Sequence, residues 1–130
     1  MAEAQSVQNL RKGYKAFAEG DMEALAEIIS EAAVWHIPGK SPLAGDYKGR
    51  DAIFGYFAKL MEVTGGTFKA ELVHALGDDS FAVALQRSTA TAQGRAYTGT
   101  DVLVDRIENG SAVETWVYLE NQDLFDELLS

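Results

Sequence analysis

The sequence predicts a single α+β domain, in which N-terminal helices pack against a strongly curved antiparallel sheet. Apolar residues recur at helical spacing in the first half of the chain. In the second half they alternate with polar residues, and turn sequences separate the alternating runs. The chain has 130 residues, of which 47% are hydrophobic, so it fits one domain over residues 1–130 with a sizeable core.

The first half contains three predicted helices and one strand. Apolar stripes run through residues 7–17, 22–29 and 50–61, and Glu19-Gly20-Asp21 supplies a stop for the first helix and a cap for the second. Residues 32–37 are apolar on both faces except for His36, which is typical of a strand covered on both sides. The Gly, Pro and Ser content of residues 39–49 predicts a loop.

The second half predicts four consecutive long strands and a short closing helix. The strands cover residues 67–76, 81–92, 96–107 and 112–119, and the closing helix carries Leu124, Phe125, Leu128 and Leu129. A sheet of long antiparallel strands with helices on one face curls into a cone. We expect a pocket between the first helix, the third helix and the concave face of this sheet.

Composition excludes several classes of function. The net charge is −9 and the 11 Lys and Arg residues are scattered, which argues against nucleic-acid and membrane-surface binding. The N-terminus lacks the apolar core of a signal peptide, and no apolar run approaches the roughly 20 residues of a membrane span. There is no cysteine to form a disulfide. We therefore expect a cytoplasmic protein.

The sequence also predicts no cofactor and no metal ion. The two histidines, His36 and His74, lie far apart, and no Cys is present to complete a zinc site. No Gly-rich nucleotide loop and no Gly-x-Ser-x-Gly nucleophile elbow occurs. The remaining chemistry is cofactor-independent acid/base catalysis, or none.

His36 is the first candidate for such catalysis. It follows Trp35 in an apolar strand that Pro38 and Gly39 end, and an imidazole titrates near neutral pH. The alternative is a core histidine that is held by a backbone carbonyl. Neighbouring residues of a regular strand face opposite sides, so if Ile37 faces the pocket, only a bulge before Pro38 would bring His36 in as well.

Asp101 and Tyr14 are the other two candidates. Asp101 lies in the middle of a predicted strand, where its carboxylate either faces solvent or lies in the pocket and orients His36. Asp105 is in register with Asp101, which slightly favours an exposed position for both. Tyr14 lies on the apolar stripe of the first helix, where it packs in the core or donates a hydrogen bond to a substrate oxygen.

The order of the elements and several short motifs resemble the NTF2-like superfamily, and most closely its SnoaL-like, ketosteroid-isomerase-like branch. The motifs are Glu19-Gly20-Asp21, Gly49-Arg50-x-x-Ile53-x-x-x-Phe57, Asn109-Gly110 and Val113-Glu114-x-Trp116-x-Tyr118. This resemblance implies a cone-shaped, cystatin-like α+β barrel with an apolar cavity, commonly dimeric. It also implies a range of functions, because the family includes isomerases, cyclases, hydratases and plain binding proteins.

Authentic ketosteroid isomerase activity is not expected. The family's catalytic tyrosine, base and second acid fall on three other residue types here: Gly13, Ile37 and Leu103. We expect instead a cavity that binds a small, mostly apolar organic molecule, with His36 as acid or base, Asp101 orienting it and Tyr14 donating to an oxygen. The alternative is a ligand-binding or accessory dimerisation module without catalysis.

Apolar and aromatic residues complete the predicted ligand site: Trp35, Ile37, Phe54, Phe57, Leu103, Trp116 and Tyr118. Trp116 and Tyr118 have a second interpretation, since they share one face of the last strand and can cover the outside of the sheet. Small and aromatic residues predict such an outer face: Ala82, Ala84, Val102, Val104, Trp116 and Tyr118. A homodimer that pairs two sheets would bury this face.

Overall fold

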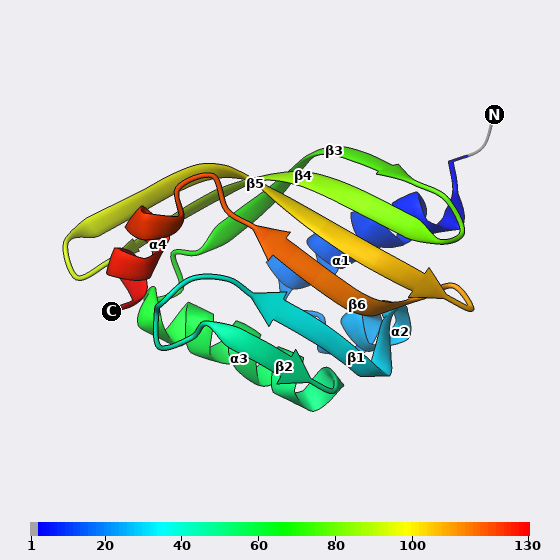
Figure 1. The fold of residues 1–130 in the computed structure, drawn as a ribbon, viewed down its shortest axis with the longest axis horizontal. Helices are drawn as coiled ribbons and strands as arrows, with labels where there is room; N and C mark the ends of the chain where they lie inside the picture. Colours follow the sequence, from blue (N-terminus) through cyan, green and yellow to red (C-terminus); the bar gives the residue numbers. More distant parts are fainter. Residues whose placement is uncertain (1–2) are drawn as a thin grey trace.

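The computed structural model describes residues 3–130, so Met1 and Ala2 of the predicted domain lie outside the described residues. Helices form at α1 (Gln5–Glu19), α2 (Met22–Ile28), α3 (Arg50–Val63) and α4 (Gln122–Leu129). Strands form at β1 (Ile29–Ile37), β2 (Gly45–Lys48), β3 (Lys69–Gly77), β4 (Phe81–Ala92), β5 (Arg95–Glu108) and β6 (Ser111–Tyr118) (Figure 1). The α+β fold class is confirmed. Within residues 3–130, no helix combines the length and apolar character needed to span a membrane.

The six strands form one curved, unclosed sheet in the order β2-β1-β6-β5-β4-β3. The pairs from β3 to β6 are antiparallel, as predicted, but β1 pairs with β6 in parallel. The sheet is therefore mixed, not wholly antiparallel. Side-chain periodicity does not encode the direction in which distant strands pair, which explains why the sequence did not reveal this pair.

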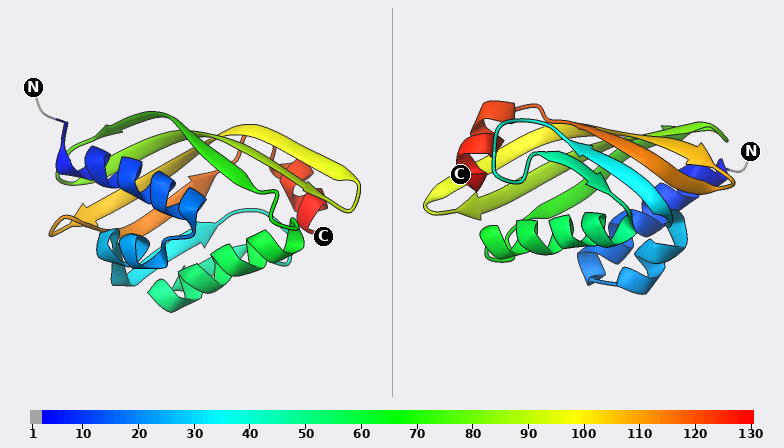
Figure 2. Two further views of the ribbon diagram at one scale, coloured as in Figure 1. Left: turned by 180° about the vertical axis from the view of Figure 1, so that it is seen from behind. Right: turned by 60° about the horizontal axis from the view of Figure 1, so that its bottom comes forward.

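The helices lie mainly on the concave side of the sheet. Figure 2 shows α1, α2 and α3 below the curved sheet, while α4 covers the end near the β4–β5 hairpin. α1 contacts β3 and β4, α3 contacts β1 and β2, and α4 contacts β4 and β5. The space between α1, α3 and the central strands is thus enclosed on several sides.

The predicted stop and cap between α1 and α2 are confirmed. Gly20 adopts a left-handed conformation with φ of 70°, and the N–H of Asp21 donates to the carbonyl of Ala16 at 2.8 Å. The side chain of Asp21 accepts a hydrogen bond from the N–H of Ala24 at 3.1 Å, which caps α2. These contacts fix the sharp turn that returns the chain to the sheet.

The strand register corrects the predicted outer face. Ala84 pairs with Leu103 and Ala82 with Asp105, so these alanines share the concave face, where they are 0% and 1% exposed. Val102, Val104, Trp116 and Tyr118 lie on the convex face as predicted, where Val83 and Leu85 take the place of the two alanines. Alternation defines two faces of each strand, but only the register between strands shows which faces coincide.

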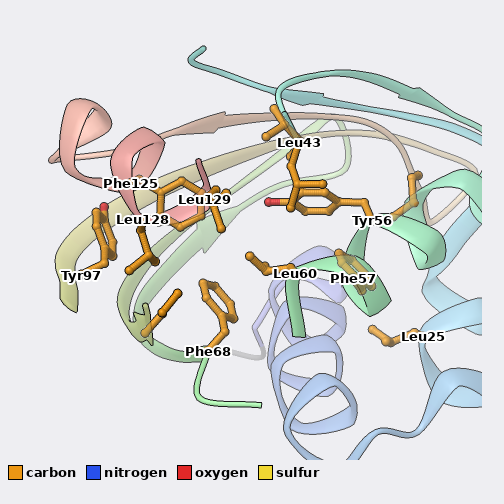
Figure 3. Packing of buried hydrophobic residues seen from close by; sticks show 14 of the residues in the cluster. Leu25, Leu43, Tyr56, Phe57, Leu60, Phe68, Tyr97, Phe125, Leu128 and Leu129 are labelled. Carbon is orange, nitrogen blue, oxygen red and sulfur yellow. The ribbon is translucent and has the colours of Figure 1, made fainter. Parts of the chain in front are cut away.

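Aromatic and aliphatic side chains from the helices fill the space next to the concave face. Figure 3 shows Phe57 and Leu60 of α3 pointing into the same region as Phe68, and Phe125 and Leu128 of α4 packing beside the sheet. Rings meet edge to face, with centroids 5.3 Å apart for Phe17 and Phe57. These rings leave a pocket open between α1, α3 and the concave face of the sheet.

A candidate ligand pocket between the helices and the sheet

A pocket of about 140 Å³ lies between α1, α3 and the concave face of β4, β5 and β6. Its wall is mostly apolar and includes six bulky residues: Phe17, Trp35, Phe57, Leu60, Phe68 and Phe125. Polar groups are few and come mainly from α1, β4 and β5. Such a cavity with few polar groups is typical of a small-molecule site.

The predicted site residues divide between this pocket and the convex face. Six of them line the pocket: Tyr14, Trp35, Ile37, Phe57, Asp101 and Leu103. Phe54 packs against Phe57 with ring centroids 6.1 Å apart and lies behind the wall. Trp116 and Tyr118 lie on the convex face, paired with Val104 and Val102. The structure therefore does not bring the three predicted catalytic residues together.

His36 lies outside the pocket, on the convex face. The pairing of β1 with β2 is regular from Val34 to Ile37, so Ile37 faces inwards and His36 outwards. The distance from Nδ1 to Asp46 Oδ1 is 2.7 Å, and Nε2 lies 2.6 Å from Glu114 Oε2. Asp101 therefore does not orient His36, and the two lie on opposite faces of the sheet.

Carboxylates on both sides stabilise the protonated imidazole. The hydrogen bond to Glu114, followed by that to Asp46, raises the pKa of His36 above its ordinary value. The ring also stacks on Trp116, with centroids 5.6 Å apart and planes 22° from parallel. His36 thus joins β2, β1 and β6 on the outside of the sheet.

Asp101 is 1% exposed and lies in the pocket wall. Its Oδ1 accepts hydrogen bonds from the hydroxyl of Tyr97 at 2.8 Å and from the N–H of Glu120 at 3.1 Å. Its Oδ2 is buried without a hydrogen-bonding partner among the described residues. Asp101 therefore ties β5 to the segment before α4 and leaves one acceptor atom free.

Asp105 is a pocket residue that sequence reasoning missed. The sequence slightly favours an exposed position, but Asp105 lies in the wall, and the hydroxyl of Thr115 donates to its Oδ1 at 2.6 Å. Burial raises the pKa of Asp105 to about 6, although the Thr115 hydrogen bond opposes this shift. The available signal was its alternation with Asp101 and Leu103, which places all three on the concave face.

Tyr14 begins a short chain of hydrogen bonds across the pocket wall. Its hydroxyl donates to Gln86 Oε1, and Gln86 Nε2 donates to Ser88 Oγ at 2.8 Å. Burial, followed by the nearby charges of Asp105 and Asp101, raises the pKa of Tyr14, so the phenol stays protonated. Gln86 and Ser88 were not predicted, because assigning them to the pocket requires the register between β4 and β5.

Residues 10–115 of the chain match the family model of the SnoaL-like domain. The chain belongs to the SnoaL-like domain family. The match covers most of the chain, including the second part of α1, all of α3 and the pocket residues on β4 and β5. It confirms the family that the sequence motifs suggested, within the NTF2-like superfamily.

Solved structures and a curated relative are similar to this chain. Bal32a, from a soil-derived mobile gene cassette, is similar with a TM-score of 0.93 and 38% identity, over 97% of both chains. An uncharacterized protein of Mycobacterium tuberculosis is 24% identical over 102 residues, which is 78% of both chains. IdmH, a putative polyketide cyclase from Streptomyces antibioticus, shares the fold with a TM-score of 0.75 and 21% identity, over 95% and 98% of the two chains.

Proposed function

We propose that this SnoaL-like protein binds a small, mostly apolar organic molecule in the pocket. The observation that carries the proposal is the position of buried polar atoms that lack a hydrogen-bonding partner. In residues 3–130 these side-chain atoms are Ser6 Oγ, Trp35 Nε1 and Asp101 Oδ2, and all three residues line the pocket. Buried polar groups nearly always have hydrogen-bonding partners, and a bound molecule would supply the missing ones.

The size of the pocket limits the ligand. A cavity of about 150 Å³ with apolar walls is large enough to hold a benzene ring. The pocket has a volume of about 140 Å³, close to this value, which favours a molecule with a single ring. The rings of Phe17, Phe57 and Phe68 would contact the apolar part of such a molecule.

The two tryptophans allow a direct binding test. Trp35 lines the pocket and Trp116 lies on the convex face, so their indole N–H signals in an NMR titration report on separate sites. We expect phenethyl alcohol, a neutral one-ring probe, to shift the Trp35 signal and leave the Trp116 signal in place. A titration that moves only Trp116, or neither signal, would contradict binding in the pocket.

Asp105 favours a second candidate function, which is proton transfer. A carboxyl group with a pKa of about 6 ionises close to neutral pH, and it lies in the same wall as the protonated Tyr14 hydroxyl. In this reaction the Asp105 carboxylate would remove a proton from a carbon next to a carbonyl. The Tyr14 hydroxyl would leave Gln86 and donate to the oxygen on which negative charge develops.

Deuterium exchange distinguishes catalysis from binding alone. In D2O, a catalytic protein would accelerate exchange at the acidic CH2 group of phenylacetone, with a rate that rises through about pH 6 as Asp105 ionises. The variant Asp105→Asn would lose this acceleration, whereas His36→Gln, altered on the convex face, would keep it. A non-catalytic binding module would bind phenylacetone without accelerating the exchange.

A further inference from the structure

The only charged side chains in the described pocket wall are the carboxylates of Asp101 and Asp105. No Lys, Arg or His from residues 3–130 joins them there. We propose that the ligand carries a basic nitrogen, which enters the pocket as an ammonium ion and pairs with the Asp105 carboxylate. This inference rests on the binding function proposed above and names the chemical class of the ligand.

Asp101 lies four residues before Asp105 on β5, about 13 Å away along an extended strand, and presents a second free acceptor atom to such a ligand. Both of its protein donors, the Tyr97 hydroxyl and the Glu120 N–H, bond to Oδ1. Oδ2 is buried in the pocket wall and receives no hydrogen bond from the described residues. A buried carboxylate oxygen requires a donor, which a second polar group of the ligand would supply.

Asp105 adds a second negative charge on the same strand and the same face. Thr115 donates to Oδ1, and no residue among 3–130 donates to Oδ2. Burial without a neighbouring cation destabilises the ionised form of this carboxyl group. An ammonium ion beside Asp105 would reverse that effect, so binding and ionisation of Asp105 favour each other.

The rest of the wall suits a cation with an apolar body. Aromatic rings line the same pocket, including Tyr14, Trp35 and Phe57, and the faces of such rings attract positive charge. The protein has a net charge of −9, which further favours cations over anions. A carboxylate-bearing ligand would instead meet two like charges without a compensating group.

Three probes with the same ring and two-carbon chain test the proposal at pH 7.5: phenethylamine, phenethyl alcohol and hydrocinnamate. The Trp35 indole signal reports their binding, with Trp116 as an internal reference. We expect the amine to bind at least about tenfold more tightly than the alcohol, because it adds a charge-assisted pair. Hydrocinnamate is expected to bind most weakly.

Two substitutions locate the selectivity. Asp105→Asn keeps the size of the side chain and an acceptor for Thr115, and it should remove most of the preference for the amine over the alcohol. Asp79→Asn makes the same change of charge at an exposed turn and should leave the preference intact. If Asp79→Asn reduces the preference as much as Asp105→Asn, the selectivity comes from net charge and the proposal is wrong.

The pH dependence gives an independent measurement. Tyr14 on α1 is the described titratable group next to Asp105, and Asp101 lies further along the same face of β5. β4 and β6 present the uncharged Gln86 and Thr115. Amine affinity should fall about tenfold from pH 7.5 to pH 5 as Asp105 takes up a proton, and alcohol affinity should stay constant.

The outcomes separate this inference from the proposed function. One outcome is that the alcohol shifts the Trp35 signal and binds as tightly as the amine, or more tightly. In that case the protein binds small molecules, but the proposal of a ligand with a basic nitrogen is wrong. Tighter binding of hydrocinnamate than of the amine would also show that the proposal of a basic nitrogen is wrong. If none of the three probes shifts Trp35, both the binding function and this inference fail.

Discussion

At the scale of single residues, Asp105 places a charge in an apolar wall and thereby lowers stability. Its pKa in the folded protein, about 6, is higher than the ordinary 3.8, so folding favours the protonated form. The stability that this group contributes is present below about pH 4 and is lost as the pH rises through 6. We therefore expect Asp105→Asn to increase the free energy of unfolding at pH 8 by about 2 kcal/mol, allowing for its partial exposure.

Urea unfolding at pH 4 and pH 8 measures this effect. The variant and the original protein should be nearly equally stable at pH 4, and the variant should be more stable at pH 8. Asp79→Asn, on the surface, serves as the control and should show no such difference. An Asp105→Asn protein that is less stable at pH 8 would show that the carboxylate stabilises the fold.

His36 should give the opposite kind of pH dependence. Glu114 and Asp46 raise the pKa of its imidazole above the value in the unfolded chain. The stabilisation is therefore fully present below the unfolded pKa and is lost as the pH rises through the folded pKa. His36→Gln should reduce the urea midpoint more at pH 5.5 than at pH 9. An equal reduction at both pH values would show that Asp46 and Glu114 do not stabilise the protonated imidazole.

At the scale of elements, substitution of two glycines by alanine should change the stability of the fold in opposite directions. Gly20 ends α1 with φ of 70° and has open space around the position of a Cβ atom, so Gly20→Ala should destabilise the fold by about 1 kcal/mol through strain alone. Gly55 lies inside α3 with equally open space. Gly55→Ala should stabilise by about 0.5–1 kcal/mol, and thermal unfolding of both variants checks the two signs.

The elements that the sequence predicted are those with local signals. The cap at Asp21, the start of α3 at Arg50 and the three hairpins depend on residues that are close in the chain. The sequence did not predict β2, because this strand has only four residues, is mostly exposed and lies in a segment rich in Gly and Pro. The parallel pairing of β1 with β6 joins strands far apart in the sequence, and no local pattern reports it.

The candidate site was predicted only in part for the same reason. Helical spacing predicted Tyr14 on the inner stripe of α1, and the family resemblance predicted Ile37 and Leu103 as pocket positions; all three line the pocket. The positions of His36 and Asp105 depend on how each strand matches its neighbours. His36 was predicted to be catalytic because it follows Trp35 at the end of an apolar strand, but the regular pleat of β1 turns its side chain towards the convex face.

At the scale of the whole molecule, the convex face of the sheet predicts a dimer. Apolar side chains lie across its centre: Val83, Leu85, Val102, Val104, Trp116 and Tyr118. Tyr118 is 56% exposed, and Phe81 and Leu76 at the edge are 47% and 60% exposed. A continuous apolar surface of this kind is unusual on a monomer, and two copies related by a two-fold axis would cover it.

Light scattering after size exclusion tests this association at micromolar concentration, where we expect about twice the chain mass of 14.1 kDa. Tyr118→Glu places a charge at an exposed position of the convex face, so it should yield monomer while probes still shift the Trp35 signal. Trp116→Glu should also yield monomer, with an additional loss of stability because Trp116 stacks on His36. A single 14.1 kDa species from the unaltered protein would rule out the dimer, since an uncovered convex face would then be stable in water.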